Sequence, residues 1–149
     1  MDADSADTEQ IWTLLRKHVP EVTSGLIKVL GIARKRGTHS VLVVAAKDPR
    51  VDSIGAVVGH RGERVKRLVS DLRGEKITVI RWDESVERFI RSLLEPLRLR
   101  QVSFDEATRE VKAMGIQPYG SRFSDLALRS ELLMNLTGWR LQLEVKEEG

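Results

Sequence analysis

A loop with two glycines three residues apart, followed by a run of cationic side chains, is the stretch of this sequence best suited to binding chemistry. The loop and the cations beyond it comprise Gly59, His60, Arg61, Gly62, Arg64, Lys66 and Arg67. Glycine has no Cβ, so it adopts positive φ angles and lets another backbone approach closely. The first N–H groups of a helix lack intrahelical partners and carry partial positive charge, which suits a phosphate group. Loop and cations together predict a binding site for a polyanion.

A second basic cluster lies earlier in the chain. Arg34, Lys35 and Arg36 precede Gly37 between two stretches rich in Val, Ile and Leu, which predicts the tip of a β-hairpin. A basic hairpin tip is often only a solvated surface, and it is also a second place to contact a polyanion. We therefore include these three cations among the candidate site residues.

The positive charge of the chain is concentrated in the segment that holds both clusters. The 149 residues carry a formal net charge of +3, but residues 10–97 contain 17 Lys and Arg against 10 Asp and Glu. Residues 98–149 contain eight of each, and residues 1–9 contain four acids and no base. A local excess of this kind favours a polyanionic partner for the first segment.

Composition also disfavours several classes of protein. The chain has no cysteine, which removes disulfides, thiolate catalysis and most structural zinc sites. The histidines at 18, 39 and 60 lack ligand spacing and no nucleophile–base arrangement occurs, so we expect no metal, no cofactor and no enzymatic activity. No apolar run is long enough to span a membrane, and the acidic N-terminus is unlike a signal peptide, which predicts a cytoplasmic protein with no membrane partner.

Short strands and helices alternate along the chain, according to its apolar pattern. Strands are predicted where Val, Ile and Leu cluster, and helices where apolar residues recur every three or four positions. The predicted helices cover 8–17, a short segment starting near Asp52, 63–73, 85–97 and 124–137. The predicted strands cover 25–37, 38–47, 76–82, 98–104, 108–114 and 139–145.

The end of the first half is repeated in the second. When residues 71–80, DLRGEKITVI, are set over residues 135–144, NLTGWRLQLE, Leu72 matches Leu136 and Gly74 matches Gly138, at an offset of 64. Internal similarity at a fixed offset indicates a duplicated unit. We predict that each unit has the order strand, strand, helix, helix, strand, which gives an α+β fold of two small domains.

Several linked motifs resemble the first KH domain of the bacterial transcription factor NusA. They are HVPEV, GIARKRG, DPRVDSIGAVVGHRGERV and LRGEKITVIRW, and the later stretch SELLMNLTGWRLQLEV resembles the end of the second KH domain of that family. The resemblance implies two tandem type II KH domains, each a small three-stranded sheet with helices on one face. In KH domains a GXXG loop clamps the nucleic-acid backbone. We place an acidic tail and lead-in helix at 1–20, the first KH domain at 21–97 and the second at 98–149.

The second KH domain departs from the family pattern at its loop. Where the family has its second GXXG, this chain has Ser124-Asp125-Leu126-Ala127, without either glycine and with an acid in the place of a phosphate. We therefore expect the second module to support the first and to take no part in RNA binding itself.

Two functions are open at this stage. The resemblance implies a single-stranded RNA-binding protein in transcription elongation, termination or antitermination, with RNA polymerase or other transcription factors as further partners. The alternative is a protein–protein adaptor that docks on RNA polymerase or a ribosomal particle and uses the KH pair mainly as a scaffold. Binding of duplex DNA is less favoured, because no segment has the features of a major-groove recognition helix.

Overall fold

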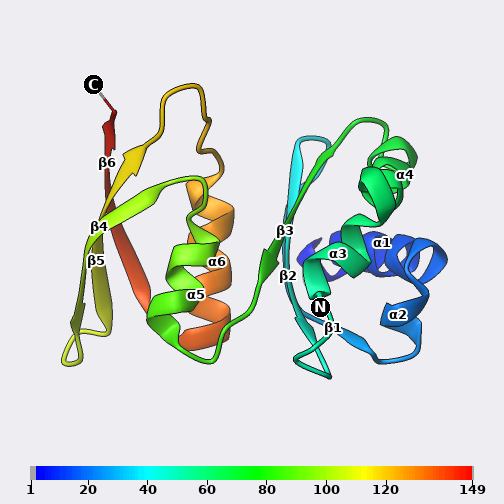
Figure 1. The fold of residues 1–149 in the computed structure, drawn as a ribbon, viewed down its shortest axis with the longest axis horizontal. Helices are drawn as coiled ribbons and strands as arrows, with labels where there is room; N and C mark the ends of the chain where they lie inside the picture. The colour runs from blue at the N-terminus through cyan, green and yellow to red at the C-terminus, as the bar shows by residue number, and fades with distance from the viewer. Residues whose placement is uncertain (1–2, 149) are drawn as a thin grey trace. The chain divides into compact units, whose positions relative to one another are not determined.

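The computed structural model describes the backbone of residues 3–148 and the side chains of residues 7–148. The chain divides into two compact units, Met1–Trp82 and Asp83–Gly149. Each unit contains its own three-stranded sheet with helices on one face, as Figure 1 shows. This confirms the predicted α+β fold of two small domains.

Over its described residues, 3–82, the first unit contains five helical segments, counting a 3-10 turn, and three strands. In chain order these are α1 (Ala3–His18), α2 (Pro20–Thr23), β1 (Ile27–Lys35), β2 (His39–Ala46), α3 (Ser53–Val58), the 3-10 turn His60–Gly62, α4 (Glu63–Asp71) and β3 (Lys76–Arg81). The central strand β2 pairs antiparallel with β1 and parallel with β3. The parallel pairing requires a crossover between β2 and β3, and α3, the glycine loop and α4 provide it.

Apolar side chains of helices and sheet form the core of the first unit. Helix α1 contributes Ile11 and Leu15, β2 contributes Leu42 and Val44, and α4 contributes Leu68, all buried. The apolar residues of α4 recur every three or four positions, so one side of that helix faces the sheet, and its cations Lys66 and Arg67 are exposed. The core therefore fixes the glycine loop, because both helices that flank the loop are packed.

The second unit contains two helices and three strands. They are α5 (Val86–Leu93), β4 (Arg98–Asp105), β5 (Glu110–Gln117), α6 (Leu126–Thr137) and β6 (Arg140–Glu147). The central β5 pairs antiparallel with β4 and parallel with β6, which repeats the pairing of the first sheet. Buried apolar residues of this unit include Leu93, Val111, Leu132, Leu133 and Trp139.

Three features differ from the predictions. The second unit has one helix between its second and third strands, not two, because residues 118–125 form turns and irregular backbone. The boundary lies at Trp82/Asp83 and not at residue 97, since α5 packs on α6 and β4 of the second unit. The helix predicted at 8–17 begins at Ala3, so the acidic segment is helical from there on, and residues 1–2 lie outside the described chain.

The described residues include no helix that is both long and apolar enough to cross a membrane.

Candidate nucleic-acid interface

The glycine loop connects two helices whose ends are set by the residues predicted for that role. The side chain of Asp52 accepts a hydrogen bond from the Gly55 N–H at 3.1 Å and caps the start of α3, which confirms the predicted cap. Helix α3 ends at Gly59, with φ 80° and ψ 172°, and α4 begins after Gly62, with φ 73°. Both conformations lie in a region that side chains with Cβ rarely adopt.

The two glycines are needed for different reasons. A Cβ on Gly59 would lie 2.7 Å from Cγ and 2.9 Å from Cβ of Arg64, closer than real Cβ contacts, and 3.0 Å from its backbone N. A Cβ on Gly62 would meet nothing closer than Lys66 Cε at 4.0 Å, so only its positive φ requires glycine there. Gly59 therefore lets α4 approach the loop closely, and Gly62 leaves open space beside the start of α4.

Among the residues that the structure describes, no side chain caps the first turn of α4. The residue in the N-cap position is Gly62, which has no side chain to accept from the first N–H groups of the helix. The Glu63 N–H donates to the His60 carbonyl, and the partial positive charge of the helix end favours an anion at the N–H groups of the first turn. The start of α4 has the local features of a phosphate site.

The predicted cations around this loop divide into free and engaged side chains. His60, Arg61, Lys66 and Arg67 are exposed, and among the described residues they form no ion pair or hydrogen bond through their side chains. Arg64 is engaged: its Nη1 donates to Glu21 Oε1 at 2.8 Å and to the Ala56 carbonyl at 2.7 Å. Arg64 thus ties α4 to α2 and to α3, while the other four side chains face solvent.

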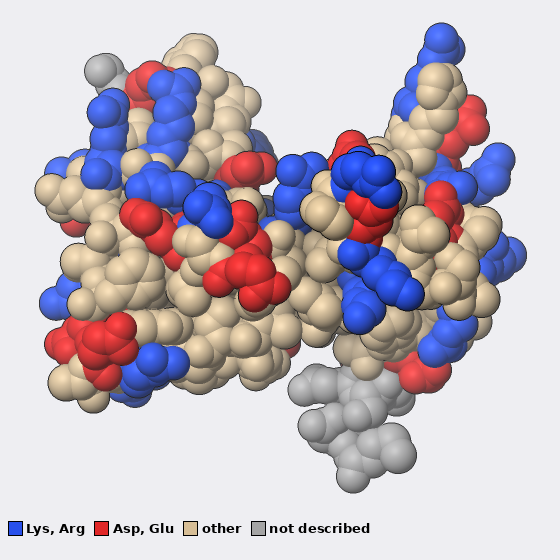
Figure 2. Space-filling model, turned by 60° about the horizontal axis from the view of Figure 1, so that its bottom comes forward, with Lys and Arg blue, Asp and Glu red and all other residues tan. Residues whose placement is uncertain are grey.

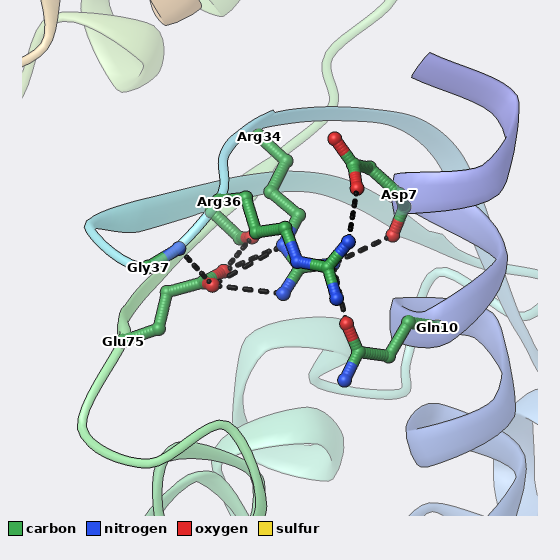
Figure 3. Close-up of polar contacts among 7 residues, drawn as sticks. Asp7, Gln10, Arg34, Arg36, Gly37 and Glu75 are labelled. Atoms are coloured by element: carbon green, nitrogen blue, oxygen red, sulfur yellow. Dashed lines mark hydrogen bonds and ion pairs between the residues drawn. The ribbon is translucent and has the colours of Figure 1, made fainter. Parts of the chain in front are cut away.

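At the hairpin tip, Arg34 is buried and its guanidinium is held from two sides, as Figure 3 shows. Its side chain is 3% exposed and its partner Glu75 is 1% exposed, with Nη2 to Oε1 at 2.8 Å and Nε to Oε2 at 2.9 Å. On the other side, Nη1 donates to the Asp7 carbonyl and to Gln10 Oε1 of α1, both at 2.8 Å. The prediction that Arg34 contacts RNA does not fit this environment, and we assign the side chain a structural role.

Glu75 is the centre of this network, and nothing in the local sequence indicated it. Its carboxylate also accepts from the Gly37 N–H at 2.9 Å and from the Ser40 hydroxyl at 2.6 Å. Burial alone would raise the pKa of the Glu75 carboxyl, but the hydrogen bonds from Arg34, Ser40 and Gly37 outweigh burial and hold the pKa below its ordinary value. Glu75 is therefore ionised and fixes the hairpin tip to the start of β3.

The remaining cations of the tip differ from Arg34. Arg36 is 71% exposed and lies 3.3 Å from a carboxylate oxygen of Asp7, an exposed ion pair of small energetic value. Lys35 is exposed, and its ammonium has no partner in the part of the chain that the structure describes. Lys35 and Arg36 therefore remain available at the surface. On the face of the molecule drawn in Figure 2, Lys and Arg side chains are interspersed with carboxylates.

In the second unit, a buried arginine fixes the loop that precedes α6. Arg129 of α6 is 3% exposed, and its Nη1 donates to the carbonyls of Leu93 at 2.7 Å and Glu95 at 3.0 Å. Its Nε donates to the Ser124 carbonyl at 2.9 Å, so the loop before α6 is bound to the end of α5. Burial lowers the pKa of the Arg129 guanidinium, and the charges of Asp125 and Glu95 act against that shift. The loop is held internally, and residues 124–127 contain no glycine.

Comparisons with known proteins agree with this architecture. The model of the family "NusA-like first KH domain" matches residues 5–82. The chain is 30% identical over 137 residues to the transcription termination/antitermination protein NusA of Halalkalibacterium halodurans, covering 91% of this chain and 36% of that protein. The NusA of Thermus thermophilus is 33% identical over 99 residues, covering 66% of this chain and 26% of the relative, and that of Bacillus subtilis is 32% identical over 136 residues, covering 88% and 36%.

The fold also has a counterpart among solved structures. The crystal structure of APE1850 superposes with a TM-score of 0.55 at 13% identity, covering 87% of this chain and 96% of that one, which shows a shared fold. The chain spans about a third of the length of the curated relatives it matches. Because the family model covers more than half of the chain, and its match ends at Trp82, where the first unit ends, this protein belongs to the NusA-like KH-domain family.

Proposed function

We propose that this protein binds single-stranded RNA through the glycine loop and the exposed cations of α4, and acts in transcription elongation, termination or antitermination. The observation that carries the proposal is the uncapped start of α4 beside Gly62, with His60, Arg61, Lys66 and Arg67 exposed and unpaired in the described chain. A phosphate at the helix start accepts backbone N–H bonds, and the free cations neutralise its neighbours along the strand.

The names of the relatives support the transcriptional part of the proposal. They are termination/antitermination proteins, and the chain matches about a third of their length. RNA polymerase and other transcription factors are proposed as further partners in the cytoplasm, and the activity is binding without catalysis. The adaptor alternative draws on the second unit, whose loop is closed by Arg129.

The double substitution His60→Asp with Arg61→Asp tests the loop. Both side chains are exposed and unpaired within residues 3–148, so the folded state should be retained. Two carboxylates at the helix start should weaken binding of single-stranded RNA by at least about tenfold, measured by fluorescence anisotropy. Thr13→Asp with Lys47→Asp, at exposed positions on α1 and after β2, changes the formal charge by the same amount and serves as the control.

Salt dependence provides a second readout of the same site. If Lys35, Arg61, Lys66 and Arg67 each neutralise one phosphate, the slope of log K against log salt for single-stranded RNA should be about −3. Wild-type affinity in the double variant, with an unchanged melting temperature, would remove the loop from the proposal. A flat salt response would favour the adaptor.

A further inference from the structure

Tyr119 is the most exposed large side chain with apolar character that the structure describes. It is 93% exposed, whereas the other exposed large hydrophobic side chains lie between 37% and 41%. It is also the single tyrosine of the chain. The ring contributes nothing to the core of the second unit, and a polar residue would leave less apolar surface in water.

The backbone that carries this ring is held by several hydrogen bonds. Residues 118–121 form a tight turn in which both the N–H and the hydroxyl of Ser121 donate to the Pro118 carbonyl, at 3.0 and 2.6 Å. Gly120 has φ +80°, as a type II turn requires at its third position. Gln117 Nε2 donates to the Ser121 carbonyl at 2.9 Å, which closes the turn against the end of β5.

A second anchor comes from the end of the chain. The N–H of Tyr119 donates to Glu148 Oε2 at 2.9 Å, and the N–H of Glu148 donates to the Gln117 carbonyl at 3.1 Å. The turn is thus fixed to the residue that follows β6, so the ring projects from an ordered backbone. A ligand that binds an aromatic side chain on an ordered turn orders few additional groups, which favours affinity.

The turn has a carboxylate on one side, from Glu148, and an unpaired cation on the other. Arg122 follows the turn by one residue, is exposed, and forms no ion pair or hydrogen bond with any other described residue. A solvent-facing aromatic ring with a free cation three residues away matches the combination by which proteins hold single-stranded nucleic acid, with a base stacked on the ring and a phosphate near the cation.

We propose that Tyr119 is a stacking platform for a base of single-stranded RNA, with Arg122 neutralising an adjacent phosphate. The inference rests on the proposed RNA-binding function and adds a second contact that does not use a glycine loop. It also departs from the expectation that the second module takes no part in RNA binding. The first unit holds the nucleic-acid backbone, and the second unit holds a base.

A fluorine label on the single tyrosine tests the stacking directly. The full chain labelled with 3-fluorotyrosine has one fluorine site, at Tyr119, and is titrated with a single-stranded RNA of about 20 nucleotides, longer than the four that a GXXG loop holds. Stacking should shift the fluorine resonance, and an abasic strand of the same length, which keeps the phosphates and lacks the bases, should leave it unshifted. A resonance that does not respond to the normal strand would overturn the proposal.

Affinity measurements on two variants complete the test. Tyr119→Ala should weaken RNA binding by about fivefold or more, while Tyr119→Phe should bind as the wild type does, because stacking needs the ring and not the hydroxyl. The melting temperature should be unchanged in both, since the side chain is 93% exposed. An equal loss of affinity for the normal and the abasic strand would overturn the stacking role.

The outcomes separate this inference from the function on which it rests. If His60→Asp with Arg61→Asp abolishes binding while Tyr119→Ala binds normally, the proposed function stands and the stacking platform is wrong. The exposed ring would then be a contact for a protein partner. If the wild-type chain binds no single-stranded RNA, both proposals fail together.

Discussion

Glu75 and Trp139 lie 64 residues apart, each at the junction between a crossover helix and the third strand of its sheet. These two junctions show how the two units stabilise the same local structure with different side chains. Each follows a glycine of positive φ, Gly74 at 95° and Gly138 at 80°, and each precedes the third strand of its sheet. Both side chains are buried, at 1% and 5% exposure. The position is thus equivalent, but one residue is an acid and the other an aromatic.

Both residues hold an arginine from the neighbouring hairpin. Glu75 binds Arg34 at 2.8 Å through a buried ion pair. Trp139 lies under the guanidinium of Arg109, 4.4 Å from the ring centroid, and packs edge to face with Phe104 at 5.0 Å. The fold requires a buried group that fixes the hairpin to the third strand, and a carboxylate or an indole ring meets that requirement.

The starts of the two long crossover helices make a second comparison. The residue before α4 is Gly62 and the residue before α6 is Asp125, and both adopt the left-handed conformation. The backbone conformation of the residue that precedes the helix is therefore similar in both units, and the two units differ in the side chain of that residue. The residues at the junctions contribute to stability, whereas the residues at the helix starts affect binding.

The largest effect on stability is expected for Glu75→Gln. The substitution leaves Arg34 buried without a counterion, which should lower the free energy of unfolding by about 3–5 kcal/mol at neutral pH. The pKa of Glu75 lies below its ordinary value of 4.5 in the folded protein, so the folded state favours the carboxylate. That contribution is present above pH 4.5 and is lost as the pH falls through the lowered pKa. Denaturant unfolding at several pH values should show the gap between wild type and variant closing in acid.

The second junction provides the matched control. Trp139→Phe should also destabilise, by about 1–2 kcal/mol through lost packing and a weaker contact with Arg109. The contact joins an indole ring to a guanidinium and contains no carboxylate, so the loss should be the same at pH 4 and pH 7. An acid-dependent loss in Trp139→Phe, or an acid-independent one in Glu75→Gln, would contradict this account of the junctions.

An effect between those of the two junction variants is expected for Arg129→Met. The change leaves the carbonyls of Leu93, Glu95 and Ser124 without their donor, which should cost about 2–3 kcal/mol. Amide hydrogen exchange in β5 should report the loss, and binding by the first unit's loop should not change. Arg64→Met is the partner experiment: its ion pair is part exposed, at 29% and 32%, and should cost about 1 kcal/mol. Equal losses in the two variants would mean that Arg129 does not close its loop.

Local patterns predicted most elements of the fold. The Asp52 cap and the hairpin tip at Gly37 each depend on neighbouring residues, and the structure has both. The helix predicted at 63–73 is also present, but it ends at Asp71 and its C-cap is Leu72, not Gly74. The second helix predicted between β5 and β6 was wrong. That prediction extended the repeat across residues 118–125, where Pro118 and Gly120 form a turn.

Long-range partners were not accessible from the sequence. Arg34 looked like a surface cation because Glu75, which buries it, lies 41 residues further along. Helix α5 was assigned to the first domain because its apolar periodicity shows that it has a buried side and does not show which core covers it. Exposure likewise cannot be deduced from residue type, so the sequence alone did not indicate that the Tyr119 ring faces solvent.

The smallest effect on stability, and the sharpest test of the helix starts, is an exchange of their residues. Gly62→Asp gives the first unit the acid of the second, and Asp125→Gly gives the second unit the glycine of the first. Asp tolerates the left-handed conformation better than most residues and the space beside Gly62 is open, so each change should alter the free energy of unfolding by about 1 kcal/mol or less.

Binding should respond in only one of the two variants. Gly62→Asp places a carboxylate where the phosphate is proposed to bind and should weaken RNA binding by about tenfold or more. Gly62→Asn has the same shape without the charge, and it should keep most of the affinity if charge and not conformation is the cause. Asp125→Gly should gain nothing, because Arg129 still binds the Ser124 carbonyl and a single glycine does not restore the loop. Anisotropy titrations of the three variants measure this, and a clear gain in Asp125→Gly would show that the second helix start differs from the first only by its acid.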